Sequence, residues 1–474
     1  MAQAEKSIDT SRLGHIRQKL GRNLPPGWEL TTLGEALKWG SGGTPKRNDP
    51  RYYEGAIPWL IIGDLNDGVV LDSETRITED GLRNSSAKWV EPGSVLLAMY
   101  GSIGKLGIAG KRLTTNQAIA FTKPDPIDAK YLFYFLMFTR GDLASLGKGA
   151  TQKNISQTVI KAFPFVLAPQ TQQARIVAEI EKQFSRLDEA VANLKRVQAN
   201  FKRYKATVLK AAVEGKLTED WRKQHPEVEP AEKLLERILA ERRAEWNGKG
   251  TYRDPEAPED HDLPKLPPGW IWATSLQVFK EVKDGTHDTP KYQEKGVPFI
   301  TQKHIKPAGL VFSDFKLISE VDHEQFYRRS NPERGDILVS MIGVNRGQSC
   351  IVSTDAIFSI KNVGLFKPNC FLTSNKFLQL YFSSLVGQKL ILRSSKGGAQ
   401  PFIGLTELRA WPLPLPPFKE QHLIVAEAER RLSVIDELEA TVKANLTRAD
   451  RLRKSILSEA FCGKLLGDNI VGQV

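Results

Sequence analysis

The sequence has 474 residues, of which 41% are hydrophobic and 26% are charged, which is enough apolar content for more than one packed core. Its formal net charge of +12 favours a polyanionic partner, most often nucleic acid; a general basicity without such a partner is the alternative. The three cysteines are widely spaced and odd in number, which argues against a disulfide framework or a zinc site and favours a reducing compartment.

No segment predicts a membrane location. The first 23 residues lack the apolar centre of a signal peptide. The most apolar run, residues 131–138, is far too short to span a bilayer. We therefore expect a soluble, cytoplasmic protein that does not associate with a membrane.

The first domain is predicted over residues 24–168, after a lead of 23 residues. It opens with LPPGW, where two consecutive prolines exclude the interior of a helix or of a central strand. Short apolar runs such as AIPWLIIGDL and GSVLLAMYG follow, broken by Gly, Pro, Asn and Asp. These runs predict strands and hairpins, with one helix near 130–140, and hence a strand-rich α/β domain.

A long helix is predicted next, over residues 169–217. Pro169 suits the start of a helix, and Gly215 suits its C-terminal cap. Residues 218–264 follow, with one charged helix at about 231–246 and then a polar linker that is rich in Pro and Asp.

The same succession of motifs then occurs a second time. LPPGW returns, and IPWL, EPGSVLLAMYGSIGK and GATQKNI have the counterparts VPFI, ERGDILVSMIGVNRG and GGAQPFI, at offsets of 240 to 248 residues. From FPFVLAPQ onward the offset stays at 248. The chain is therefore a duplicated unit, with a second domain over 265–416, a second long helix over 417–465 and a tail over 466–474. Insertions occur only in the domains, which indicates that the helices have a fixed length.

Apolar residues recur at seven-residue spacing in both long helices, which predicts a coiled-coil seam. At about 1.5 Å per residue, each rod would be roughly 67 Å long. Because the helices have equal lengths, we expect them to pair within the chain; two unrelated surface helices are the alternative. The residues expected to pack helix against helix are Ile180, Phe184, Leu187, Val191, Leu194, Phe201, Val208, Leu432, Ile435, Val442, Leu446 and Ile456.

No catalytic or metal-binding pattern is found. GSIGK and GIAGK lack the spacing of a phosphate loop, and no GxGxxG follows a predicted strand. The seven histidines have no metal-ligand spacing. We expect no catalytic residue, no metal and no cofactor on this chain.

Binding residues are instead concentrated in glycine-rich turns at corresponding positions of the two domains. Lys, Arg, Asn and Gln in such turns can approach phosphates and base edges closely. For each residue an ordinary exposed side chain is the alternative, but recurrence in both copies favours binding. The DNA-binding candidates are Lys46, Arg47, Lys105, Lys148, Gln152, Lys153, Asn154, Lys291, Tyr292, Asn345, Arg346, Lys396 and Gln400. Trp28 and Trp270, in the two copies of LPPGW, are predicted as packing anchors.

Eight motifs occur in a fixed order along the chain: GTPKR, IPWL, GSVLLAMYGSIGK, NQAIAF, GATQKNI, FPFVLAPQTQQARIV, LPLPPFKEQHLIV and AFCGKLL. With these motifs, the sequence resembles the specificity subunit of type I restriction-modification systems over nearly the whole chain. The resemblance implies two strand-rich α/β target-recognition domains, separated by two long antiparallel helices that form an intramolecular coiled coil with pseudo-twofold symmetry. Each domain would read one half of a bipartite, asymmetric site in double-stranded DNA, and the helices would set the spacer between the halves.

The resemblance also implies partners and a role in host defence. The helices would dock two modification (methyltransferase) subunits and, through them, two restriction (motor-nuclease) subunits. S-adenosylmethionine, ATP and Mg are expected on those partners only. The second copy departs from the first, with Pro401 in place of Lys153, so base-contacting roles do not transfer between the halves. A free-standing coiled-coil DNA-binding or interaction protein without methyltransferase partners is the alternative.

Overall fold

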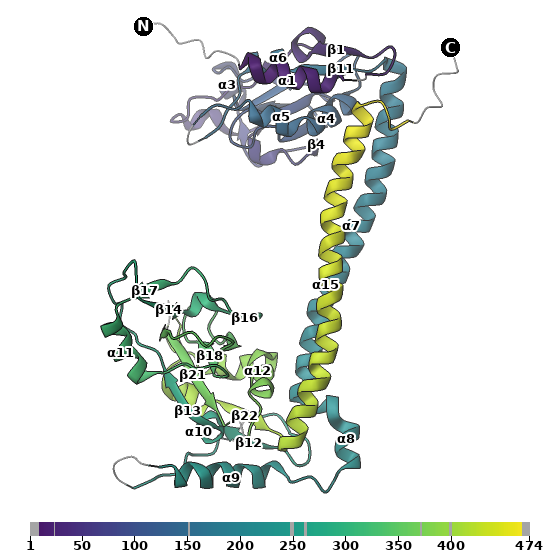
Figure 1. Ribbon diagram of the computed structural model, residues 1–474. Coiled ribbons are helices and arrows are strands. Elements are labelled where there is room, and N and C mark those ends of the chain that lie inside the picture. Colours follow the sequence, from purple (N-terminus) through teal and green to yellow (C-terminus); the bar gives the residue numbers. More distant parts are fainter. Residues whose placement is uncertain are drawn as a thin grey trace. The chain divides into compact units, whose positions relative to one another are not determined.

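The computed structural model describes residues 9–22, 24–149, 152–246, 251–259, 263–369, 372–397 and 401–466. The chain forms two compact units. Unit 1 comprises Met1–Lys195 with Lys443–Val474, and unit 2 comprises Arg196–Val442. The boundary falls inside both long helices, α7 (Gln170–Val213) and α15 (Phe418–Phe461), which have 44 residues each (Figure 1).

Unit 1 contains three sheets, and most of their pairs are antiparallel. The first pairs β2 (Gly40–Ser41), β10 (Ile119–Thr122), β7 (Val95–Ala98), β8 (Leu106–Ala109) and β4 (Gly68–Val70) in that order. The second pairs β5 (Arg76–Ile77), β3 (Tyr53–Leu60), β9 (Leu113–Thr115) and β6 (Trp89–Val90), and the third pairs β1 (Glu29–Thr32) with β11 (Pro164–Leu167). Only β3 with β9 and β4 with β8 run parallel among these pairs. The shorter helices are α1 (Thr10–Gly21), α2 (Leu33–Ala36), α3 (Glu79–Arg83), α4 (Ala129–Phe138), α5 (Arg140–Ser145) and α6 (Gln157–Ala162).

Unit 2 has the corresponding sheets. They are β13 (Phe279–Asp284), β21 (Val363–Pro368), β18 (Ile337–Ser340) and β19 (Ser349–Ile351); β17 (Lys316–Ile318), β14 (Val297–Thr301) and β20 (Ser359–Lys361); β12 (Ile271–Thr274) with β22 (Pro412–Leu415); and a small pair, β15 (Ile305–Lys306) with β16 (Gly309–Leu310). Again the pair β14–β20 is parallel, as β3–β9 is in unit 1. The shared strand order confirms that the chain is a duplication.

The helices of unit 2 also follow the order found in unit 1. They are α10 (Ser275–Val278), α11 (Glu320–Arg329), α12 (Asn375–Ser383), α13 (Leu385–Arg393) and α14 (Leu405–Ala410), preceded by α8 (Glu219–Gln224) and α9 (Ala231–Ala244). Helix α9 lies where the sequence predicts a charged helix, and its Leu234 and Ile238 are buried in the core of the unit. None of the described helices combines the length and the apolarity needed to cross a membrane.

Each core extends from the sheets onto the long helices. In unit 1 the ring of Phe461, at the end of α15, lies with its centroid 5.3 Å from both Tyr131 and Phe135 of α4. Helix α4 is apolar on nearly all sides because it is enclosed by the sheet and by the helix pair. The sheets and the long helices of a unit therefore share one hydrophobic core.

Helix α1 lies within the segment that the sequence predicts only as a lead. Its buried Ile16 and Leu20 join the core of unit 1, and its Arg12 donates a hydrogen bond of 2.6 Å to the carbonyl of Ser145. Leu13, Ile16 and Leu20 recur at helical spacing, but three apolar residues in a polar segment of this length did not lead to a predicted helix. The lead thus contributes to the first domain.

The long helices pack against each other in antiparallel directions within each unit (Figure 1). In unit 1 the guanidinium of Arg453 lies 4.5 Å from the ring centroid of Phe184 and pairs with Asp188. In unit 2 the ammonium of Lys205 lies 2.6 Å from a carboxylate oxygen of Asp436 and 2.8 Å from one of Glu439. All twelve residues predicted to pack helix against helix are buried or half-buried.

Both copies of LPPGW close the joint between a domain and the helices. Trp28 donates a hydrogen bond of 2.9 Å to Gln172 near the start of α7, and Trp270 donates one of 2.8 Å to Glu420 near the start of α15. The preceding prolines pack on the glycine that ends the other helix: a Cβ on Gly463 would lie 1.9 Å from Pro25, and one on Gly215 would lie 2.6 Å from Pro267. Both tryptophans are buried and act as packing anchors.

Candidate nucleic-acid interface

The first element of the candidate interface is a glycine turn that joins two central strands. We call it the tip turn; it covers residues 99–105 between β7 and β8, and residues 341–347 between β18 and β19. Gly101 and Gly104 have φ of +63° and +86°, and Gly343 and Gly347 have φ of +74° and +81°. Residues with a Cβ rarely adopt such angles, so the tight turn depends on these glycines.

A second segment braces each tip turn. This bracing segment covers residues 148–155 in unit 1 and 396–403 in unit 2. In unit 1 the amide of Ile155 donates to the carbonyl of Met99 at 2.9 Å, and in unit 2 Ile403 donates to Met341 at the same distance. Two further backbone bonds join Lys148 to Asn154, and the equivalent bonds join Lys396 to Phe402. The two units therefore build the same assembly from segments that are about 50 residues apart in sequence.

The structure brings most of the predicted residues together on this assembly. Lys105, Lys148, Gln152, Lys153 and Asn154 lie on the tip turn and bracing segment of unit 1. Asn345, Arg346 and Lys396 lie on those of unit 2, whereas Gln400 lies outside the described residues.

The remaining candidates lie on a third element, the outer loop, which covers residues 42–49 after β2 in unit 1 and residues 285–296 after β13 in unit 2. Lys46 and Arg47 are exposed there in unit 1, as are Lys291 and Tyr292 in unit 2. In unit 1 the amide of Gly43 donates to the carbonyl of Thr115 at 3.0 Å, which fixes the start of the loop against the end of β9. Exposed cations on a fixed loop are suited to phosphate contacts.

Several predicted cations have partners within the protein, among them Lys105, Arg346 and Lys396. The ammonium of Lys105 donates to the carbonyls of Ile62 and Gly63, both at 3.2 Å, and Lys396 forms an ion pair with Glu407. The guanidinium of Arg346 lies 3.2 Å from the hydroxyl of Ser395 and 3.3 Å from the carbonyl of Gly343. These three side chains therefore hold the loops in place as well as carrying positive charge.

Two side chains that lie 248 residues apart, Arg140 on α5 and Gln388 on α13, support the tip turns of the two units. In unit 1 Arg140 donates a hydrogen bond of 2.8 Å to the carbonyl of Gly104 and forms an ion pair of 2.6 Å with Asp67. In unit 2 Gln388 donates one of 2.6 Å to the carbonyl of Gly347. The turns are thus fixed from three sides by backbone and side-chain hydrogen bonds.

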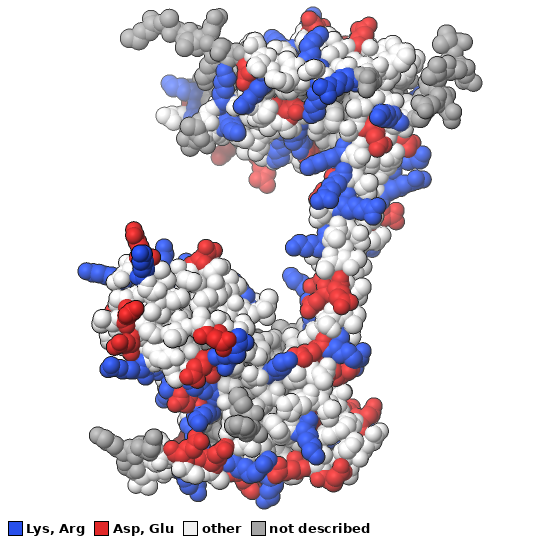
Figure 2. Space-filling view, viewed as in Figure 1, with Lys and Arg blue, Asp and Glu red and all other residues white. Residues whose placement is uncertain are grey.

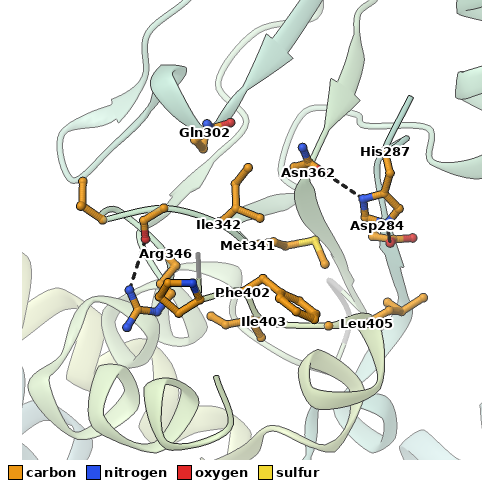
Figure 3. A pocket seen from close by; sticks show the side chains of 14 residues that line it. Asp284, His287, Gln302, Met341, Ile342, Arg346, Asn362, Phe402, Ile403 and Leu405 are labelled. Carbon is orange, nitrogen blue, oxygen red and sulfur yellow. Dashed lines mark hydrogen bonds and ion pairs between the residues drawn. The ribbon is translucent and has the colours of Figure 1, made fainter. Parts of the chain in front are cut away.

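An open pocket of about 720 Å³ lies between the tip turn, the bracing segment and the outer loop of unit 2. Figure 3 shows Gln302 and Asn362 on one side of it and Phe402, Ile403 and Leu405 on the other. A second pocket of about 370 Å³ shares Gln302 and Asn362 and is also lined by Lys303, Lys316 and Lys361. The two amides thus line both pockets, with apolar side chains in the first and lysines in the second.

The polar side of this pocket was not predicted from the sequence. The carboxylate of buried Asp284 pairs with Arg329 at 2.8 Å and lies 3.0 Å from Nε2 of His287, whose Nδ1 lies 2.7 Å from the side-chain oxygen of Asn362 (Figure 3). The side chain of Gln302 makes no hydrogen bond within the described part of the chain. Asp284, Gln302, Arg329 and Asn362 come from segments far apart in sequence; Asp284 and His287, three residues apart in DGTHDTP, were the one available signal.

Basic residues also mark the long helices. Residues 190–213 of α7 include six Lys or Arg residues and no Asp or Glu. In unit 1, Figure 2 shows Lys and Arg side chains prevailing over acidic ones on the visible face of the helix pair. Where the structure describes the chain, no three His, Cys, Asp or Glu side chains are grouped so that they could hold a metal ion.

The duplicated units agree with the family to which the chain is similar. The family description "Type I restriction modification DNA specificity domain" matches residues 25–197 and again residues 278–448. Each match begins within or near a recognition domain and extends into a long helix.

Individual relatives match over nearly the whole chain. The type I restriction enzyme EcoDI specificity subunit of Escherichia coli is 25% identical over 93% of this chain and 89% of its own length. The MjaVIII specificity subunit of Methanocaldococcus jannaschii is 22% identical over 96% of this chain and 97% of its own.

A solved structure has the same fold. Described as "Structural basis underlying complex assembly and conformational transition of the type I R-M system", it aligns with a TM-score of 0.63 and 19% identity over 93% of this chain and 99% of the solved chain. With the two family matches, the duplicated fold and the helix pair in agreement, the chain belongs to the type I restriction-modification DNA specificity family.

Proposed function

We propose that this chain is the non-catalytic DNA-recognition subunit of a type I restriction-modification complex and that it reads a bipartite, asymmetric site in double-stranded DNA. The observation that carries the proposal is the presence of two equivalent loop assemblies whose side chains differ. Equivalent backbones present their loops in the same way, whereas different side chains select different bases. Each unit reads one half of the site.

The exposed cations of both assemblies and the half-buried amides of the unit 2 pocket have separate roles. Lys46, Arg47, Lys153 and Lys291 contact phosphates, which fixes the domain on the duplex without selecting a sequence. Amides such as Gln302 and Asn362 contact base edges, since a carboxamide can form two hydrogen bonds to adenine. By the same rule, the remaining candidate cations contact phosphates and the remaining candidate amides contact base edges.

The helix pair sets the distance between the half-sites. Each residue of a continuous helix adds about 1.5 Å, so the length of a 44-residue helix is fixed by its number of residues. The unvarying offset of 248 residues along both helices supports this role, since an unequal insertion would shift one helix face against the other.

The helix pair also docks the partner subunits. Val197, Tyr204, Val434 and Leu438 lie on the helices of unit 2 and are 39% to 51% exposed. Apolar side chains at such positions are typical of a surface that another protein covers. The proposed partners are two modification (methyltransferase) subunits and two restriction (motor-nuclease) subunits. They carry S-adenosylmethionine, ATP and Mg, and the assembled complex acts on DNA in the cytoplasm.

The experiment is expression of the chain with its modification subunits in a host that lacks other methyltransferases, followed by genome-wide mapping of methylated adenine. We expect one split motif with two different halves. The alternative, a free-standing coiled-coil protein, predicts a stable intermolecular coiled coil and no new methylation. Because α7 pairs with α15 of the same chain, the intramolecular arrangement favours the first interpretation.

A further inference from the structure

The tip turns of the two units differ in chemistry although their backbones correspond. In unit 1 the exposed positions are Tyr100 and Ser102, with Asn154 on the bracing segment. The matching positions of unit 2 hold Ile342, Val344 and Phe402. The tip of unit 1 therefore carries a phenol, a hydroxyl and an amide, whereas the tip of unit 2 is apolar.

The apolar side chains of unit 2 are strongly exposed. Val344 is 96% exposed and Phe402 is 43% exposed. Exposed apolar area is unfavourable in water and becomes favourable once it is covered. Because the tip is fixed by the bonds from Arg346, Gln388 and Lys396, the side chains are held in this exposed position by the fold itself.

The surroundings of the tip indicate what covers it. The pocket beside it carries Gln302 and Asn362, and the adjoining pocket carries Lys303, Lys316 and Lys361. A protein-binding patch is typically depleted of lysine, whereas a DNA-binding surface combines cations for phosphates with amides for base edges. The apolar group that DNA exposes in its major groove is the 5-methyl group of thymine.

We propose that Val344 and Phe402 read the 5-methyl group of a thymine in the major groove of the half-site that unit 2 recognises. The inference rests on the proposed DNA-reading function and adds the chemical feature that one half-site contains. Unit 1 has Ser102 and Asn154 at these positions, so it makes no methyl contact there. The two half-sites thus differ in readout at the corresponding step.

The test uses the complex of this chain with its modification subunits and the mapped bipartite site. Thymine is replaced by uracil in the second half-site, which removes the 5-methyl group and keeps the pairing with adenine. Covering one methyl group contributes about fourfold in affinity, so the wild-type complex is expected to bind the uracil duplex about fourfold more weakly. Val344→Ser, which supplies the unit 1 residue, should reduce this preference, and Val344→Ser combined with Phe402→Asn, which supplies both unit 1 residues, should bind both duplexes equally.

The matched control is Val321→Ser, on α11 of unit 2, where the valine is 78% exposed and outside the three loops. It should keep the wild-type preference for thymine. Val344→Ser should also leave the response to the first half-site unchanged.

Several results would overturn the inference. One is equal binding of thymine and uracil duplexes by the wild-type complex; another is an unchanged preference for thymine in the variant that carries both Val344→Ser and Phe402→Asn. A third is loss of assembly with the modification subunits in Val344→Ser, which would place the tip against protein. A complex that binds no specific site at all would instead contradict the proposed function.

Discussion

The joint between domain and long helix contains a charged residue, Glu420, in unit 2 and a neutral one in unit 1. Removing the charge of Glu420 therefore tests how much that charge contributes to the stability of the unit 2 joint. Glu420 is fully buried at the start of α15, where it accepts hydrogen bonds from Thr218 at 2.6 Å, from Trp270 at 2.8 Å and from Arg222. In unit 1 the corresponding residue is the neutral Gln172, which accepts from Trp28 alone among the described residues. We therefore compare Glu420→Gln with the neutral joint that the chain already contains.

The expected cost follows from the burial of both charges. The side chain of Arg222 is 17% exposed and that of Glu420 is 0% exposed, so solvent screens the pair weakly. Breaking a buried pair by removing one partner costs about 3–5 kcal/mol. Because glutamine keeps an acceptor for Trp270, we expect Glu420→Gln to cost about 2–3 kcal/mol. Arg222→Leu together with Glu420→Gln should recover most of this loss, since no unpaired charge remains.

Hydrogen exchange measured by mass spectrometry resolves the two units. The opening free energy of the β12–β22 amides should fall in Glu420→Gln, while that of the β1–β11 amides should remain at the wild-type value. Gln172→Leu is the matched variant in unit 1 and should cost about 1 kcal/mol, since it removes one neutral hydrogen bond. The reasoning is refuted if Glu420→Gln costs the same in the Arg222→Leu background as in the wild type, within about 0.5 kcal/mol.

The remaining predictions concern backbone geometry, pH and helix length. Gly215→Ala should destabilise unit 2 in denaturant unfolding by more than Gly93→Ala destabilises unit 1, because both have positive φ but only the Cβ at 215 would meet a neighbour, Pro267 at 2.6 Å. Hydrogen bonds from Arg430 and Arg431 lower the pKa of Glu427 from 4.5 to about 2, so this carboxylate stabilises the folded chain above pH 4.5. That contribution, about 1 kcal/mol for a half-buried group on the helix surface, should be lost as the pH falls toward 2 and be absent in Glu427→Gln. Inserting seven residues after Leu194, with seven more at the facing position of α15, should lengthen the spacer in the methylation motif by about three base pairs. The reason is that seven helical residues add roughly 10 Å. Both half-site sequences should stay the same, and changed half-sites would contradict the spacing role.

The repeated motifs and the seven-residue periodicity were sufficient to predict the duplication, the two long helices and their pairing. These features depend on local patterns that survive in a single sequence. The glycine-rich turns were also identified, because a turn with positive φ restricts the residue types that can occupy it.

Other parts of the site depend on contacts between distant segments. Lys105 was predicted as a DNA contact, but the sequence could not reveal that its ammonium reaches the carbonyls of Ile62 and Gly63. Likewise Asp284, Gln302 and Asn362 meet at one pocket only because three separate strands end there. Which surface residues line a pocket is a property of the folded chain, and no spacing rule in the sequence contains it.

The most direct test of the central claim is the methylome of a host that expresses this chain with its modification subunits, compared with hosts in which one recognition domain is replaced. We predict a split motif with two different halves, and replacement of residues 265–416 by another domain of the family should change one half and leave the other half and the spacer unchanged. A continuous or palindromic motif, or a replacement that alters both halves, would contradict the account of two independent readers on one helix pair.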